Sequence, residues 1–358
     1  MALAKIAGSF TLLMALGLCI LLLHKSSAAS YASEQNPAKV ERFDPAASDI
    51  IPDGAVLLKL STGYTWTEGP IWTRDGYLLF ADIPSNTIRK LPAGGEAGIF
   101  LQPSGYLGSA PFGGREPGSN GMTLDAHGRL TVAGHGQRDV YRIESLSNPG
   151  QTTILADTFE GKRLNSPNDL VYKSDGSLYF TDPPYGLPTQ KDTDPKKELK
   201  VNGVYRLAGA AEQKPGAESR RDKLQLLIKD LPRPNGIAFS PDEKILYVSN
   251  SEPQKIWMRY RVNADGTLAN GEVFYDATSD KRPGAPDGIK VDERGNLYGS
   301  GPGGLWIFSP TGKHIATILM PEVVANLNWG GNDGKSLFIT ASSSVYRIDL
   351  KITGVRPH

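Results

Sequence analysis

Cysteine is nearly absent from this chain. The one cysteine among 358 residues, Cys19, lies in an apolar segment near the N-terminus, so the rest of the chain has no disulfide and no thiol nucleophile. An excess of charge of one sign is also missing, because 39 Lys and Arg oppose 38 Asp and Glu, for a formal net charge of +1. The two signs are interspersed, whereas nucleic-acid binding needs a clustered basic face. We therefore expect no nucleic-acid partner.

Several catalytic motifs are missing as well. No nucleophile-elbow signature is present for a Ser-His-Asp triad. The Gly-rich stretches Gly113-Gly-Arg and Gly301-Pro-Gly-Gly lack the strand-to-helix context of a phosphate loop. The five histidines form no motif. Only His135 lies near the end of a predicted strand between Gly neighbours, which makes it a candidate substrate-binding residue.

The first 29 residues differ in composition from the rest. Lys5 precedes an apolar run over residues 6–23, and the small residues Ser26-Ser-Ala-Ala-Ser follow. This order is typical of an export signal cleaved after Ala28 or Ala29, and the length of the run leaves an uncleaved membrane anchor as the alternative. We expect an exported protein, periplasmic or secreted, with a flexible lead-in over residues 30–49 and a folded domain over residues 50–352.

Six oxygen-bearing side chains recur at one position of a repeated pattern. Each stands eight residues before a polar turn position, and a short apolar stretch follows it. These six donor residues are Glu68, Asn120, Asn168, Asn235, Asp287 and Asn326, and the turn positions are Gly76, Gly128, Gly176, Glu243, Gly295 and Gly334. A constant offset means that one spatial position recurs in every structural unit.

The stretches around each turn have the pattern of paired strands. In the third repeat, Leu170-Val-Tyr leads to Ser174-Asp-Gly and then to Leu178-Tyr-Phe-Thr. Asp-Gly between apolar runs signals a hairpin, because tight hairpin turns need positive φ. Repeats of roughly 40 to 68 residues, with several strands each and no helical period, predict an all-β, six-bladed β-propeller. We expect residues 55–59 to add a strand to the last blade and close the ring.

The chemistry of the six donor residues favours a hard cation. Glu68 and Asp287 supply two negative charges and the four amides supply neutral oxygens, which suits a divalent ion of the calcium class at the centre of the propeller. Zinc is less suitable because these positions contain no sulfur and no histidine. For any single Asn or Asp before Gly, a turn role is an equally good explanation, but a turn does not require Glu at the first position.

Longer motifs resemble a known family. They are Leu164-Asn-Ser-Pro-Asn-Asp-Leu-Val, Ser174-Asp-Gly-Ser-Leu-Tyr-Phe-Thr-Asp-Pro-Pro-Tyr-Gly, Pro234-Asn-Gly-Ile-Ala-Phe-Ser-Pro-Asp, Pro286-Asp-Gly-Ile-Lys-Val-Asp and Asn326-Leu-Asn-Trp-Gly-Gly. Their order and spacing resemble the gluconolactonase branch of the SMP-30/gluconolactonase/luciferin-regenerating-enzyme family. The resemblance implies a six-bladed propeller with a divalent metal, usually Ca²⁺, in the central channel, and hydrolysis of a sugar lactone. Zn²⁺ and Mg²⁺ are alternatives for the metal.

The resemblance also implies the roles of the site residues. The metal ligands fall on Glu68, Asn168, Asn235 and Asp287. Asp287 is in addition the catalytic residue, either as general base or as the group that orients a metal-bound water.

The remaining candidates would hold the substrate. Asn120 and Asn326 are left to bind substrate or a water. Tyr185 could stack on a sugar ring, and a tyrosine that fills the edge of a blade is an equally good explanation of it. Some relatives carry an Arg two residues before the Asn168 position to bind the sugar. Ser166 stands there in this chain, and Arg163 is the nearest arginine.

Other functions fit the same propeller. One is calcium-dependent hydrolysis of organophosphates or aryl esters at the same metal site, and another is a non-catalytic binding module. A quinone-dependent sugar dehydrogenase is disfavoured, because the basic and histidine cluster that would hold the quinone is missing. The oligomeric state is not determined by these patterns.

Overall fold

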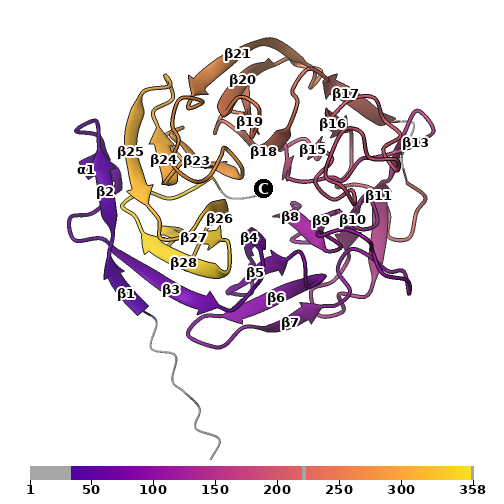
Figure 1. The fold of residues 1–358 in the computed structure, drawn as a ribbon, viewed down its shortest axis with the longest axis horizontal. Helices are drawn as coiled ribbons and strands as arrows, with labels where there is room; N and C mark the ends of the chain where they lie inside the picture. The colour runs from indigo at the N-terminus through magenta and orange to yellow at the C-terminus, as the bar shows by residue number, and fades with distance from the viewer. Residues whose placement is uncertain (1–33, 220–222, 356–358) are drawn as a thin grey trace, which may run out of the picture. The chain divides into compact units, whose positions relative to one another are not determined.

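The computed structural model describes residues 34–219 and 223–355, so the predicted leader over residues 1–29 lies outside the described residues. The chain forms six small antiparallel sheets, arranged as blades around a central axis (Figure 1). This confirms the all-β, six-bladed β-propeller. Within the described ranges, we find no helix with the length and apolar character needed to cross a membrane.

Each of the first three blades contains four strands in sequence order, with the first strand nearest the axis (Figure 1). Blade one is β4 (Thr67–Trp72), β5 (Tyr77–Asp82), β6 (Thr87–Pro92) and β7 (Gly98–Leu101); blade two is β8 (Ser119–Leu124), β9 (Leu130–Gly134), β10 (Asp139–Ile143) and β11 (Thr152–Ala156); blade three is β14 (Leu170–Tyr172), β15 (Leu178–Asp182), β16 (Gly203–Leu207) and β17 (Leu224–Ile228). Between blades two and three, the chain makes a short hairpin of β12 (Thr158–Phe159) and β13 (Lys162–Arg163).

Blade four again contains four strands in sequence order, whereas blades five and six each include strands from the beginning of the chain. Blade four is β18 (Pro234–Phe239), β19 (Ile245–Asn250), β20 (Ile256–Val262) and β21 (Leu268–Asp276); blade five is β22 (Ile289–Val291), β23 (Leu297–Gly301), β24 (Gly304–Phe308), β25 (His314–Leu319) and β2 (Lys39–Arg42); blade six is β26 (Val324–Gly330), β27 (Ser336–Ala341), β28 (Ser344–Asp349), β3 (Val56–Thr62) and β1 (Glu34–Pro37).

The ring closes where β3 pairs antiparallel with β28, with Leu58 opposite Arg347. This confirms the predicted closing strand. The expectation of a flexible lead-in is corrected for residues 34–49, because they contain β1, β2 and the short helix α1 (Ala47–Ile50). β1 and β2 are polar, yet they pair at the outer edges of blades six and five, where charged side chains suit an edge strand.

The predicted turns are confirmed by the backbone. All six turn positions have left-handed φ, between 55° at Glu243 and 85° at Gly295. Glu243 is the only one of these positions without glycine. Its carboxylate accepts hydrogen bonds from the Lys173 ammonium at 3.0 Å and the Ser174 backbone N–H at 2.6 Å on the neighbouring blade. These charge-assisted bonds offset the strain of the left-handed conformation.

The apolar core is divided among the spaces between blades. Each pair of adjacent blades buries its own cluster, such as Leu79 of blade one with Val132 of blade two. Large aromatic side chains fill the wider outer parts, for example Trp257 against Phe308 at 4.9 Å between ring centroids. Since the apolar residues pack between sheets, the innermost strands are left to carry polar groups around the axis.

Candidate metal-binding and catalytic site

The six donor residues lie where the innermost strands begin. In blades one, two, four and six, a register shift falls at or beside the donor, as between Glu68 and Ile71. In blades three and five, the strand begins only two residues after Asn168 and Asp287. A bulge or a delayed ladder turns a side chain out of the regular alternation. The turn explanation for these residues is therefore wrong, because none of the six occupies a hairpin turn.

Hydrogen bonds connect neighbouring donor segments across five of the six blade boundaries, and at the sixth Gly69 closely approaches the Asn120 carbonyl. The hydrogen bonds are Gly121 N–H to Asn168 O at 2.8 Å, Gly236 N–H to Asp287 O at 3.2 Å, Gly288 N–H to Ala325 O at 2.8 Å, the Thr181 hydroxyl to Asn235 O at 2.7 Å, and the Asn326 amide to Glu68 Oε2 at 3.1 Å. The constant offset in the sequence thus corresponds to one contiguous belt of polar residues.

Glycine follows most of the donors because the next blade passes too close for a side chain. A Cβ on Gly69 would lie 2.2 Å from the carbonyl oxygen of Asn120, and one on Gly236 would lie 2.2 Å from that of Asp287. In blade three this position is Asp169, which is 1% exposed. The belt therefore contains a third carboxylate that the six-donor pattern missed. The Asn168-Asp pair was a visible signal, because it is the one donor of the six that is followed by a carboxylate.

Two amides present unpaired oxygens. Asn235 Nδ2 donates to the Ser251 hydroxyl at 3.1 Å, and Asn120 Nδ2 lies 3.3 Å from His135 Nε2. The Oδ1 atoms of both side chains are buried and have no hydrogen-bond partner. Because an unpaired buried carbonyl oxygen costs free energy, such atoms call for a ligand.

Burial and nearby negative charge raise the pKa of two carboxylates of the belt, Glu68 and Asp287. Burial, with added repulsion from Asp169 and Glu116, raises the pKa of Glu68 to about 8. Burial and the charges of Glu68, Asp169 and Glu116 raise the pKa of Asp287 well above its usual range. Asp287 keeps partial exposure, whereas Glu68 is 2% exposed. Carboxylates crowded in this way need protons or a cation to neutralise them.

Lysine supplies only part of that neutralisation. Lys290 Nζ lies 3.7 Å from Asp169 Oδ2, which has no hydrogen-bond partner. Neither Lys290 nor Glu116 was among the predicted site residues. Glu116 belongs to the long loop between β7 and β8, where no repeated pattern marks it.

The donor set fits a hard divalent cation. In the described part of the chain, no three His, Cys, Asp or Glu side chains assemble into a metal cluster. An ion would therefore depend on amide oxygens in addition to carboxylates, and oxygen-only coordination is the preference of Ca²⁺ and Mg²⁺. Glu68, Asp287 and the free oxygen of Asn235 would hold it, with Asn168, 3% exposed, in the neighbouring blade.

The other predicted site residues have different placements. Both polar atoms of the Asn326 side chain are hydrogen-bonded. Its Nδ2 donates to Glu68 Oε2 at 3.1 Å, and its Oδ1 accepts from Leu327 N–H at 2.8 Å. Tyr185 is half-buried, and its hydroxyl hydrogen-bonds Ser251, beside Asn235. Arg163 is not brought into this group. It is exposed on β13, where its guanidinium donates to Gln137 O.

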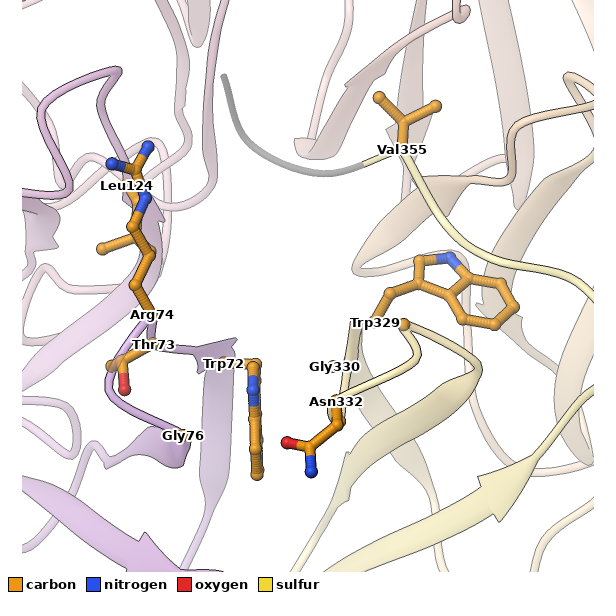
Figure 2. Close-up of a pocket in the computed structure, with 11 residues that line it drawn as sticks. Trp72, Thr73, Arg74, Gly76, Leu124, Trp329, Gly330, Asn332 and Val355 are labelled. Carbon is orange, nitrogen blue, oxygen red and sulfur yellow. The ribbon is translucent and has the colours of Figure 1, made fainter.

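A cavity of about 490 Å³ lies at the opposite end of the inner strands (Figure 2). Its wall includes Trp72 at the end of β4, Arg74 in the following turn, Trp329 of β26 and Val355. The donor residues begin these same strands, whereas the cavity is formed by their far ends and turns. The candidate site is therefore distinct from this cavity.

Comparison with known proteins identifies the family. The profile of the SMP-30/gluconolactonase/LRE-like region matches residues 66–343, and the chain belongs to this family. It is similar to a gluconolactonase of Zymomonas mobilis, with 37% identity over 326 residues that span 88% of this chain and 87% of that protein.

Solved structures agree with this assignment. The fold is similar to that of a gluconolactonase from Xanthomonas campestris, with a TM-score of 0.72 and 30% identity over 89% of this chain and 96% of the other. Regucalcin from Agrobacterium tumefaciens, a calcium-binding protein, shares the fold with a TM-score of 0.62 and 18% identity over 84% of this chain and 95% of its own.

Proposed function

We propose that the protein is a Ca²⁺-dependent lactonase that hydrolyses a gluconolactone-like sugar lactone to the hydroxy acid, with Asp287 as the catalytic carboxylate. Membership of the family and the similarity to gluconolactonases support the lactonase class. The observation that carries the metal dependence is the pairing of carboxylates of raised pKa with buried, unpaired amide oxygens in one belt.

Glu68 and Asp287 differ in exposure, and we assign them different roles. When bound, a divalent cation supplies a Lewis acid for the lactone carbonyl. Glu68 is deeply buried and accepts hydrogen bonds from Gly69 N–H and Asn326, so it is held in place as a ligand. Asp287 is the more exposed carboxylate, and it is suited to take a proton from the attacking water or to orient that water.

Tyr185 and Ser251 form the wall beside the catalytic carboxylate. The Ser251 hydroxyl donates to Pro286 O at 2.7 Å, immediately before Asp287. It also accepts from Asn235 and contacts the Tyr185 hydroxyl. A polar wall ending in an aromatic ring fits a sugar, which has hydroxyls at its edge and an apolar face.

A panel of aldonolactones tests the reaction. Acid release is measured with the purified protein, after chelation, and after Ca²⁺, Mg²⁺ or Zn²⁺ is restored. We expect lactone hydrolysis that is lost with chelator and returns best with Ca²⁺. Turnover of aryl esters or organophosphates in preference to every lactone would support the alternative hydrolase, and no turnover despite Ca²⁺ binding would favour a binding module.

The composition of residues 1–29 supports a further proposal, that the protein is exported to the periplasm or beyond. N-terminal sequencing of the protein from fractionated cells tests this. A mature N-terminus near residue 29 or 30 is expected, and an intact chain in the soluble cytosolic fraction would contradict it.

A further inference from the structure

His135 lies between a carboxylate and one of the donor residues. Its side chain is completely buried. On one side of the ring, Nδ1 is 2.9 Å from Glu116 Oε2, and on the other side Nε2 is 3.3 Å from Asn120 Nδ2. Nδ1 has no regular hydrogen-bond partner, so its approach to Glu116 is a short electrostatic contact. The three side chains form a polar chain that ends at the belt.

The chemistry of these contacts decides which end of the Asn120 amide faces the belt. A lone pair on Nδ1 would repel the Glu116 carboxylate at this distance, so Nδ1 carries the ring proton. In the neutral ring Nε2 is then an acceptor, and only the amide nitrogen of Asn120 can donate to it. The amide oxygen is left over, which is why Asn120 Oδ1 is buried and unpaired.

The same arrangement occurs two blades away. Asn235 Nδ2 is tied to the Ser251 hydroxyl, and its Oδ1 is likewise buried and unpaired. In two donor residues on different blades, Asn120 and Asn235, the amide nitrogen is hydrogen-bonded and the amide oxygen is left free. By contrast, Asn326 uses both its nitrogen and its oxygen in hydrogen bonds. Asn120 therefore resembles the predicted ligand Asn235 more than it resembles Asn326, with which the sequence paired it.

The loop residue Gln190 holds Glu116, which is the outer end of the polar chain Glu116–His135–Asn120. Gln190 Nε2 donates to Glu116 Oε1 at 2.8 Å and to Tyr185 O at 3.0 Å. The backbone of Gly186 passes over His135, because a Cβ on Gly186 would lie 2.5 Å from the His135 Cβ. The loop that carries Tyr185 thus holds Glu116 and His135 in place.

We propose that Asn120 Oδ1 is an additional ligand of the divalent-cation site, and that Glu116 and His135 are positioning residues that set the orientation of its amide. This inference rests on the proposed cation dependence, and it reassigns Asn120 and His135 from substrate binding. Outer partners of this kind typically contribute about 10- to 100-fold in metal affinity.

Calorimetric titration of the metal-free, full-length protein with Ca²⁺ alone tests the proposal. We expect His135→Phe, which keeps a ring but removes the acceptor, to weaken Ca²⁺ binding at least about tenfold, and Asn120→Ala to weaken it similarly. His135→Gln should retain most of the affinity, since its carbonyl oxygen can accept from Asn120. The double variant His135→Phe/Asn120→Ala should lose no more than Asn120→Ala alone. His314→Phe, at a half-buried histidine on β25, is the matched control and should bind Ca²⁺ as the wild type does.

Folding is checked for every variant by circular dichroism and thermal melting. Unchanged Ca²⁺ affinity in a folded His135→Phe protein would overturn the proposal. A double variant whose loss of Ca²⁺ affinity equals the product of the two single losses would also overturn it. A raised KM for lactone with unchanged Ca²⁺ affinity would return Asn120 to substrate binding. Wild-type protein that binds Ca²⁺ but hydrolyses no lactone would overturn the proposed reaction only, and wild-type protein that binds no Ca²⁺ would overturn this inference outright.

Discussion

Asn326 donates its side-chain amide to the Glu68 carboxylate at 3.1 Å, across the boundary between blade six and blade one. The two residues are 258 positions apart in the chain. Glu68 receives one other hydrogen bond on the same oxygen, from Gly69 N–H at 2.9 Å. One of the two hydrogen bonds to this buried carboxylate therefore comes from Asn326, the last of the six donor residues.

Replacing Asn326 by Leu should destabilise the metal-free protein by about 1–3 kcal/mol, because it keeps a similar volume but removes a hydrogen bond to the buried Glu68 carboxyl group and takes away the acceptor of the Leu327 N–H. Urea unfolding in the presence of chelator measures this. Asn148→Leu, at an exposed turn, is the control and should change the free energy of unfolding by less than about 0.5 kcal/mol. Equal stability of the two variants would show that the Asn326–Glu68 bond contributes nothing.

Asp287→Asn should lower kcat for the lactone by at least about 100-fold, because the variant keeps the shape of the side chain and loses the group that accepts the proton or orients the water. Initial rates at saturating lactone and Ca²⁺ measure it. Asp265→Asn, at an exposed turn of blade four, removes one charge elsewhere and should leave kcat unchanged. Near-normal turnover by Asp287→Asn would remove the catalytic assignment.

The metal-free protein should become less stable as the pH rises. The folded protein holds a proton on Glu68 up to a pKa of about 8, whereas the ordinary value is 4.5. Between those values the folded state binds more protons than the unfolded state, so the free energy of unfolding falls with rising pH. Asp139 and Asp182, each with its pKa raised by burial to about 7, act with the same sign.

Melting temperatures from pH 5 to pH 8.5, with chelator and constant ionic strength, check this dependence. Glu68→Gln should reduce the slope without abolishing it, and saturating Ca²⁺ should reduce it in the wild type. A metal-free melting temperature that rises across this range would contradict the charge crowding inferred for the belt.

Gly236→Ala should destabilise the protein by about 1–3 kcal/mol, because the new Cβ would lie 2.2 Å from the carbonyl oxygen of Asp287 and push blades four and five apart. Chemical unfolding measures the loss, and Ca²⁺ affinity should fall with it. Gly98→Ala on β7 is the control, since its Cβ meets nothing within 4 Å. A Gly236→Ala protein as stable as Gly98→Ala would mean that the belt tolerates wider spacing.

The propeller and the belt of donors were predictable because they repeat. The constant offset of eight residues between donor and polar turn occurs six times, and Glu243 shows that the turn geometry holds even where glycine is replaced. β1 and β2 escaped prediction because they are short, polar edge strands without an apolar face of their own.

The inner structure of the site was less predictable. Asn120 and Asn326 have the same repeat position, yet one has a free oxygen and the other has none. This difference depends on partners that the repeat does not specify: His135 and Glu116 in one case, and the Glu68 side chain of the adjacent blade in the other. Glu116 lies in an irregular loop, so no periodic signal points to it.

The closure of the ring by β3 and β28 has a consequence for biosynthesis. β3 leaves the ribosome well before its partner, Ser344–Asp349, which comes far later in the chain. A nascent chain that stops before β28 would leave β3 without its partner and expose a strand edge at which chains can aggregate. The Asn326–Glu68 contact also joins the two ends of the ring. Translation products that stop before β26 would in addition leave Glu68 without its hydrogen bond from Asn326.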